Sequence, residues 1–172
     1  MPVVSSLRTP RRQRGVSIVE ALVALLVLSV GMLGIAVMYL ESVRANRTAL
    51  SRTLAVHLVN DMADRIRANR MGRDKYDAAF GTAPGAPKAN CATNDCTAAD
   101  LAVYDLSQWY GAVVNALPQG ADGKTVPQVE VKYNAGATSN DPARYTVTAR
   151  WKDVGSDDFL VTRLEFTAIG ST

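Results

Sequence analysis

The 172-residue sequence has little of the chemistry that most enzymes and metal sites need. It contains one histidine, His57, two cysteines and no glycine-rich phosphate-binding motif. A Ser-His-Asp set could use only His57, which lies in a helix-forming stretch without an obvious nucleophile nearby. Zinc sites use about four ligands, and the cysteines are far from the histidine in sequence. We therefore expect a protein that is not an enzyme and that uses neither a metal nor a cofactor.

Formal charge is absent from residues 21–40. A helix needs about 20 residues, at roughly 1.5 Å each, to cross a bilayer, and this run has that length. A cleavable secretory signal is the alternative, but its apolar core is usually only about 7–15 residues, followed by a small-x-small cut site. Residues 34–36 match such a site weakly. We interpret residues 16–41 as a hydrophobic transmembrane helix.

Acids are absent from the first fifteen residues, whereas arginines are frequent there, at Arg8, Arg11, Arg12 and Arg14. Removing these four charges from the formal net charge of +3 leaves −1 on the rest of the chain. The pI of about 9.0 therefore reflects a basic leader, residues 1–15, and does not indicate nucleic-acid binding. By the positive-inside tendency, the arginines hold the N-terminus in the cytoplasm. The chain beyond residue 41 then lies across the membrane.

The two cysteines are consistent with an oxidising compartment on that side. Cys91 and Cys96 are separated by four residues in a loop-like stretch, where such a pair most simply forms a disulfide. The loop that it closes is small, so the chain-entropy contribution is only about 2 kcal/mol. A redox pair is the alternative, although redox cysteines usually have C-x-x-C spacing. We predict a disulfide that fixes a local turn.

Proline and glycine are absent from residues 41–70, so helix propensity continues beyond the apolar run. Asp61 and Arg65 are an i,i+4 ion pair on this segment. A slowly drifting apolar stripe recurs every fourth residue, at Leu50, Leu54, Leu58, Met62 and Ile66. These patterns predict one nearly continuous helix over residues 16–70, whose second half is amphipathic and packs on a globular body.

Gly31 and Gly34 interrupt the apolar half of this helix. Each weakens a helix interior by about 1 kcal/mol relative to alanine. In a membrane, glycines also allow helices to approach closely, although this spacing is not GxxxG. Local flexibility and close packing both remain open as explanations.

A second, shorter helix is predicted after a loop. Residues 71–90 are rich in glycine and proline, which is typical of a connecting loop. Thr97 and Asp100 then match a capping box, and Pro118 and Gly120 end the helical pattern.

The last third of the sequence alternates apolar and polar residues with period two. Three runs show the alternation, at residues 129–133, 144–151 and 160–168. They predict an antiparallel sheet with one buried face. We therefore expect an α+β fold in which a long N-terminal helix packs on an antiparallel β-sheet with a short second helix. Residues 42–172 form the head of this fold.

Several motifs together resemble the type IV pilins. RQRGVSIVE at residues 12–20 is similar to a prepilin (type III) signal, with a basic leader, a glycine before the cut and an acid five residues into the mature chain. EALVALLVLSVG at residues 20–31 and DMADRIRAN at residues 61–69 resemble the V-type minor pilins (type IV pilus modification protein, PilV). The cysteine pair, DLSQW at residues 105–109 and YTVTARW at residues 145–151 fit this family more loosely.

The resemblance implies that an inner-membrane prepilin peptidase cuts between Gly15 and Val16 and methylates the new amine. Val16 stands where the family more usually has phenylalanine, which bears on the efficiency of methylation. The apolar half also lacks the proline that many major pilins have. The family implies a minor pilin of type IV pilus assembly or initiation, held in the bacterial inner membrane with its head in the periplasm and later packed into the fibre.

The partners implied are the peptidase, other minor and major pilins, and the inner-membrane assembly machinery. A minor pseudopilin of a type II secretion system shares the signal and the fold class and is the nearest alternative. A signal-anchored periplasmic domain is a further alternative, and it predicts an intact bond between Gly15 and Val16.

Placing the ionised side chain of Glu20 at the edge of the apolar run costs free energy. An ionised carboxylate costs about 2.5–3.5 kcal/mol at the centre of a spanning helix and less near its edge. Cleavage creates a nearby cation, the amine of Val16, at about 6 Å for four residues of helical rise. The amine of a neighbouring subunit can come closer. We interpret Glu20 as a residue that sets register in assembly. An interfacial acid that reaches water is the alternative.

Overall fold

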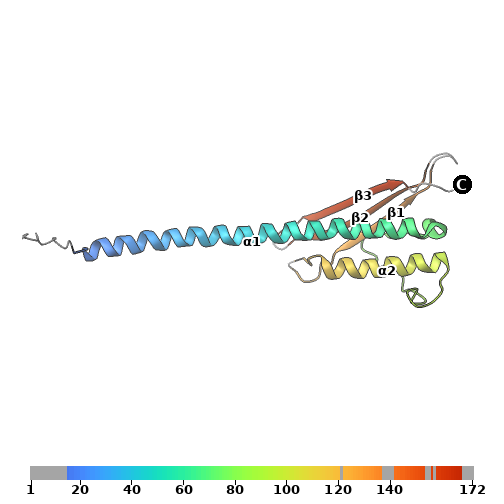
Figure 1. Cartoon of the computed structure of the whole chain (residues 1–172), viewed down its shortest axis with the longest axis horizontal. Coiled ribbons are helices and arrows are strands. Elements are labelled where there is room, and N and C mark those ends of the chain that lie inside the picture. Colours follow the sequence, from blue (N-terminus) through green and yellow to red (C-terminus); the bar gives the residue numbers. More distant parts are fainter. Residues whose placement is uncertain (1–14, 121, 137–141, 154–155, 157, 168–172) are drawn as a thin grey trace, which may run out of the picture. The chain divides into compact units, whose positions relative to one another are not determined.

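The computed structural model describes residues 15–120, 122–136, 142–153, 156 and 158–167. The leader arginines and Ala168 lie outside these residues, as do parts of the two turns between strands. The elements follow in the order α1 (Ile18–Ala68), the 3-10 helix η1 (Arg70–Lys75), α2 (Ala98–Ala116), β1 (Gln128–Asn134), β2 (Arg144–Lys152) and β3 (Phe159–Thr167) (Figure 1). The predicted fold class, a long N-terminal helix with a short second helix and an antiparallel sheet, is confirmed.

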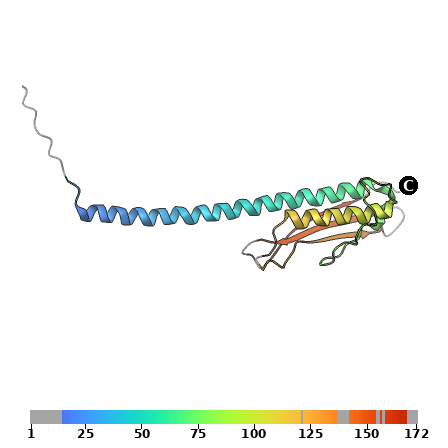
Figure 2. The same cartoon turned by 90° about the horizontal axis from the view of Figure 1, so that it is seen from below.

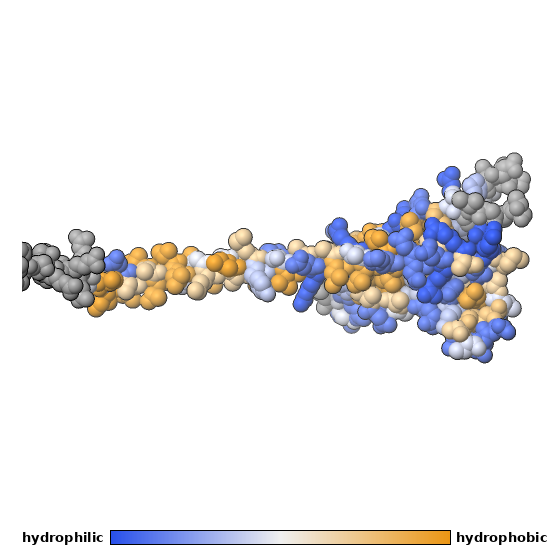
Figure 3. All heavy atoms as spheres, in the orientation of Figure 1, coloured by the Kyte–Doolittle hydropathy of each residue, from blue (hydrophilic) through white to orange (hydrophobic). Residues whose placement is uncertain are grey.

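The chain divides after Arg44 into two units. In the first unit, every described residue up to Ser42 is exposed. Hydrophobic side chains cover the visible face of this half of α1 in Figure 3. α1 is long and apolar enough to cross a membrane by its length and composition. A Cβ at Gly31 or Gly34 would meet no atom within 4 Å, so neither glycine serves a contact within the described chain.

The second unit buries one face of α1. This face consists of Ser51, Ala55, Val59, Met62, Ala63 and Ile66. Leu54 and Leu58 pack partly against the core, whereas Leu50 is 60% exposed. The prediction that Leu50 belongs to the packed stripe is therefore wrong. A spacing of four residues drifts ahead of the helical repeat of about 3.6, so the stripe leaves the core face over several turns.

α2 begins at the cap that its sequence predicts, and it is docked on α1. The Thr97 hydroxyl accepts a hydrogen bond from the Asp100 backbone N–H at 3.1 Å and donates to the Asp100 carboxylate at 2.7 Å. Trp109 is fully buried, and its indole N–H donates to the Leu58 carbonyl of α1 at 2.7 Å. This bond and the shared core hold the two helices side by side, as both views show (Figure 2).

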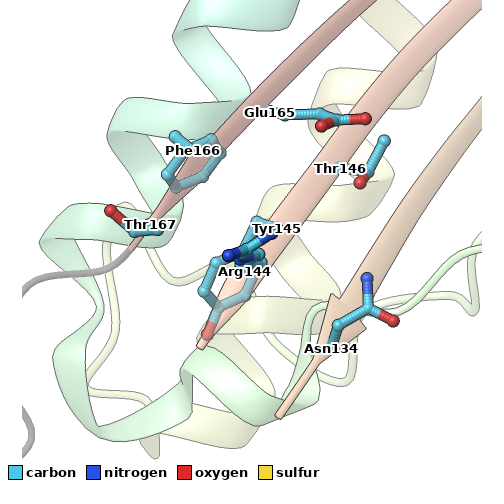
Figure 4. Close-up of a pocket in the computed structure, with 7 residues that line it drawn as sticks. All are labelled: Asn134, Arg144, Tyr145, Thr146, Glu165, Phe166 and Thr167. Carbon is cyan, nitrogen blue, oxygen red and sulfur yellow. The ribbon is translucent and has the colours of Figure 1, made fainter. Parts of the chain in front are cut away.

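The three strands form one antiparallel sheet in the order β1-β2-β3. Register pairs such as Val131 with Val147 and Val147 with Leu164 share a face. That inner face packs against both helices. Near one end of the sheet, the centroid of the Tyr145 ring lies 5.3 Å from that of Phe166 (Figure 4). The Tyr133 ring lies 5.2 Å from the Tyr145 ring, measured in the same way. The inner face of the sheet is one layer of the core, and the two helices form the other layer.

The stretch after α1 is more ordered than the predicted connecting loop. η1 follows α1 directly, and the Asn69 side chain caps it by accepting a hydrogen bond from the Gly72 N–H at 3.2 Å. Ala78 then exchanges two backbone hydrogen bonds with Val131 of β1, at 3.0 and 2.9 Å. The loop prediction is wrong for these residues because short elements held by tertiary contacts leave no periodic pattern in the sequence.

Candidate functional site

Gly15, Val16 and Ser17 form a short non-helical lead to α1. The Ser17 carbonyl accepts from the Ala21 N–H at 3.1 Å, so helical hydrogen bonding starts immediately after this lead. Val16 is 72% exposed, and a Cβ at Gly15 would meet nothing within 4 Å. An exposed, irregular backbone is the form in which a peptidase can bind a peptide bond.

Glu20 lies in the first turn of α1. Its side chain is exposed, and no cation of the described residues pairs with it. Backbone N–H groups at a helix N-terminus favour an acid there by about 0.3–1 kcal/mol. The helix start thus gives this carboxylate partial compensation, and a full counter-charge has to come from a newly formed amine or from another molecule.

The surface that follows Glu20 is apolar on all sides. From Leu22 to Leu40 each large aliphatic side chain is more than half exposed. A helix that is hydrophobic all round is stable in a membrane or in the core of a larger assembly. This segment therefore requires an apolar partner that the chain itself does not supply.

Cys91 and Cys96 are joined by a disulfide, with their Cα atoms 5.6 Å apart. The turn that it closes is also held by Asn90, whose carbonyl accepts from the Asn94 N–H at 3.0 Å. The disulfide comes directly before the N-cap residue Thr97. The covalent link therefore fixes the chain where α2 begins.

A buried polar cluster was not found by sequence reasoning. Asp105 of α2 is 7% exposed and accepts from the Tyr76 hydroxyl at 2.6 Å and from the Arg65 guanidinium at 3.1 Å. Asn69 donates to the Tyr76 oxygen at 3.1 Å and to the Ala98 carbonyl at 2.8 Å. Burial and the hydrogen bond to Asp105 raise the pKa of Tyr76 well above its usual range. The cluster ties the end of α1 to α2.

One signal could have revealed this cluster. The stretches DMADRIRAN and DLSQW each place an acid, an arginine or an amide beside core positions, where polar residues need partners. The predicted Asp61–Arg65 pair is present at 2.9 Å, and Arg65 bridges from it to Asp105. Elsewhere in the described residues, no three His, Cys, Asp or Glu side chains gather as a metal site would require.

The fold and this N-terminal segment define a class of protein. A charge-free apolar helix that continues as the amphipathic helix of an α+β head is the architecture of a type IV pilin-like subunit. The prokaryotic N-terminal methylation motif matches residues 10–36, and the family model described as type IV pilin Tt1218 matches residues 37–107. The chain belongs to the type IV pilin superfamily. Comparisons with curated proteins and with solved structures found no match.

The matches agree with the geometry of the N-terminal segment. The methylation motif includes Gly15, Val16 and Glu20, and it implies processing by a prepilin peptidase. The chain therefore has a pilin or pseudopilin role and assembles with other pilins. Its apolar helix serves in membrane anchoring and in incorporation into the pilus. The family is structural and not enzymatic.

Proposed function

We propose that this chain is a minor pilin that takes part in the assembly or initiation of a type IV pilus. A prepilin peptidase of the bacterial inner membrane cuts between Gly15 and Val16 and methylates the amine of Val16. Before assembly the subunit crosses the inner membrane once, with its head in the periplasm. It then joins other minor and major pilins through residues 16–41, with the help of the inner-membrane assembly machinery.

The observation that carries this proposal is the exposed, charge-free half of α1 that directly follows Glu20. This half needs an apolar environment at every stage. A bilayer supplies it first, and a bundle of equivalent helices can supply it in the fibre. An ionised Glu20 in either environment needs a cation, and leader removal creates one at Val16. Cleavage and assembly are thereby linked through one ion pair.

The minor-pilin assignment is supported by residues 20–31 and 61–69, which resemble the V-type minor pilins. The second of these stretches holds Asp61, Arg65 and Asn69, which belong to the polar contacts around Asp105. Their hydrogen bonds within this cluster explain why Asp61, Arg65 and Asn69 occur together. No feature of the described residues favours the alternative, a minor pseudopilin of a secretion system.

The first test is the mature N-terminus. The full-length protein would be produced in a host that has a prepilin peptidase, and the membrane fraction would be analysed by mass spectrometry. We expect loss of residues 1–15 and addition of one methyl group to Val16. A membrane protein that retains an intact Gly15–Val16 bond would contradict the proposal and favour the signal-anchored alternative.

The second test concerns Glu20 as the register residue. Glu20→Ala is compared with Glu41→Ala, which removes the other acid from the same stretch of helix, where it pairs with Arg44 at 3.1 Å. We expect Glu20→Ala to be cleaved but to lower the number of fibres in piliated cells, because the amine loses its partner. Glu41→Ala should leave fibre number unchanged. If cleavage and fibre number are both normal in Glu20→Ala, the register role is wrong.

A further inference from the structure

The outer face of the sheet, opposite the helices, is cationic. Strand register places five basic side chains on it, namely Lys132, Arg144, Arg150, Lys152 and Arg163. The same face has two acids, Glu130 and Glu165. Its net charge is therefore +3. Residues 45–172 contain 14 basic and 14 acidic residues, so the rest of this unit has a charge of −3.

Arg150 is a cation of this outer face that contacts two aromatic rings and a side-chain amide. Its guanidinium carbon lies over two aromatic rings, 3.9 Å from the Phe80 centroid and 5.0 Å from the Phe159 centroid. Its Nε donates to the Gln128 side-chain oxygen at 2.8 Å, and one terminal nitrogen donates to the same oxygen. The two rings and the amide oxygen thus hold the guanidinium in place. Its remaining N–H donors are held at the edge of the plane, where a planar acceptor can bind them.

Arg150 has no carboxylate partner among the described residues. The acid nearest in register, Glu130, is itself largely buried and is paired with Lys132 at 3.0 Å. A half-buried guanidinium without a counter-ion is an energetically expensive arrangement unless a ligand completes it. Arginines that are held against aromatic rings are also frequent hot spots of protein interfaces.

We propose that the outer face of the sheet binds a protein partner that presents aspartate or glutamate side chains, with one carboxylate bonded to Arg150. Charge complementarity favours an acidic partner for a face of net charge +3. Val161 is 55% exposed and stands opposite Arg150 in the register, so an apolar contact lies beside the charged one. This combination of arginine, aromatic rings and an aliphatic side chain resembles an interface core.

The other end of the outer face has a different balance of charge, and this difference indicates where the acidic partner binds. An open hollow there is lined by polar residues that include Asn134, Arg144, Thr146 and Glu165 (Figure 4). Glu165 offsets the charge of Arg144 at this end. Hydrogen bonds from Thr125 and Lys124, and then the charge of Lys152, lower the pKa of Asp122, so Lys152 has an acid nearby. The least opposed positive charge of the face therefore lies around Arg150 and Arg163.

This inference goes beyond the proposed role in assembly and does not depend on it. The pilus role uses residues 16–41, whereas this surface uses strands of the other unit. Loss of fibres in Glu20→Ala and loss of acidic-partner binding in an Arg150 variant are separate readouts. Either proposal can fail while the other holds.

The test uses the full-length protein in detergent micelles and poly-L-glutamate as the acidic probe, with affinity measured by fluorescence anisotropy at two salt concentrations. Arg150→Gln removes the held cation, and Arg163→Gln removes an exposed cation of the same face. Arg52→Gln, on an exposed position of α1, is the matched control. We expect about tenfold weaker binding for Arg150→Gln, because hydrogen bonds to charged groups are the stronger ones. A smaller loss is expected for Arg163→Gln and none for Arg52→Gln.

Three results would overturn the proposal. Equal losses in all three variants would mean non-specific attraction to the whole molecule. Stronger, Arg150-dependent binding of duplex DNA would identify a nucleic-acid surface. Arg150-dependent self-association in sedimentation experiments would identify a second copy as the occupant. If circular dichroism shows that Arg150→Gln does not fold, the Arg163→Gln variant decides the question. The Arg163 side chain makes no hydrogen bond within the described residues, so its replacement should not disturb the fold. Unchanged binding in the Arg163→Gln variant would then contradict the inference.

Discussion

At the scale of single residues, the Tyr76 hydroxyl is the central hydrogen-bonding group of the buried polar cluster. It donates to Asp105 and accepts from Asn69. Tyr76→Phe leaves a buried carboxylate oxygen and an amide N–H without this partner, which typically costs about 1–3 kcal/mol. We expect that loss in the free energy of unfolding, measured by urea denaturation followed by circular dichroism.

Tyr104→Phe is the matched control for this change. Tyr104 is a half-buried tyrosine of α2 whose hydroxyl makes no hydrogen bond within the described residues. Its removal should change stability by less than about 0.5 kcal/mol. Equal stability of the two variants would show that the hydrogen bonds around Asp105 contribute nothing.

Tyr145 makes the stability of the head depend on pH in the alkaline range. Burial, and then the neighbouring Tyr133, raise the pKa of Tyr145 to about 12, while Arg73 acts in the opposite direction. An unfolded tyrosine titrates near pH 10. Above that pH the unfolded state loses its proton and the native state keeps it, so the stabilisation present below pH 10 is lost as the pH rises toward 12.

The corresponding measurement is urea unfolding between pH 9 and 11.5. The wild type should lose stability above pH 10 with a contribution from Tyr145 of up to about 1.4 kcal/mol per pH unit. Tyr145→Phe should show a shallower decline, because this contribution is absent. Parallel curves for the two proteins would mean that Tyr145 titrates normally in the fold.

At the scale of elements, Gly72 controls the contact between η1 and α2. A Cβ built there would lie 2.3 Å from the Ala98 carbonyl oxygen, which is backbone and cannot move aside cheaply. Gly72→Ala should therefore separate η1 from the start of α2 and destabilise the head by about 1–3 kcal/mol. Thermal unfolding monitored by circular dichroism measures the effect.

Gly111→Ala is the opposite case. This glycine lies inside α2, and a Cβ there would meet no atom within 4 Å. Alanine should stabilise the helix by up to about 1 kcal/mol, because glycine has the greater backbone entropy to lose. An unchanged or raised melting temperature for Gly72→Ala would contradict the assignment of Gly72 as a packing glycine.

Local chemistry explains which elements could be predicted from the sequence. α1 was expected over residues 16–70, and its start, its end and the Thr97 cap are all local signals. The strands follow from alternation. η1 and the bridge at Ala78 depend on contacts with Ala98 and Val131, which are distant in sequence, so they left no such signal.

The same distinction holds for the functional residues. Gly15, Val16 and Glu20 stand within six positions of one another, so their pattern is visible in the chain. The Asp105 contacts join residues 29 and 40 positions apart, and Arg150 meets Phe80 only in the folded sheet. Sequence patterns therefore indicated the assembly segment, whereas the polar cluster and the outer face of the sheet required the fold.

At the scale of the whole molecule, the division after Arg44 predicts an independent head. Every fully buried side chain among the described residues belongs to the unit Ala45–Thr172. The apolar half of α1 therefore adds exposed hydrophobic surface and no core. A protein consisting of residues 45–172, secreted so that the disulfide forms, should be soluble without detergent and unfold cooperatively.

A shorter head sets the boundary of that unit. Removing residues 45–53 as well would eliminate the Thr48 hydrogen bond to Asp153 and the buried Ser51, and it would leave Ala55 in a fraying first turn. We expect this form to be less stable than residues 45–172 by about 2 kcal/mol or more, because it loses a tertiary hydrogen bond and part of a packed helix face. Guanidinium denaturation of the two proteins measures the difference. Equal stability would place the start of the head after residue 53 and confine the role of residues 45–53 to contacts outside this chain.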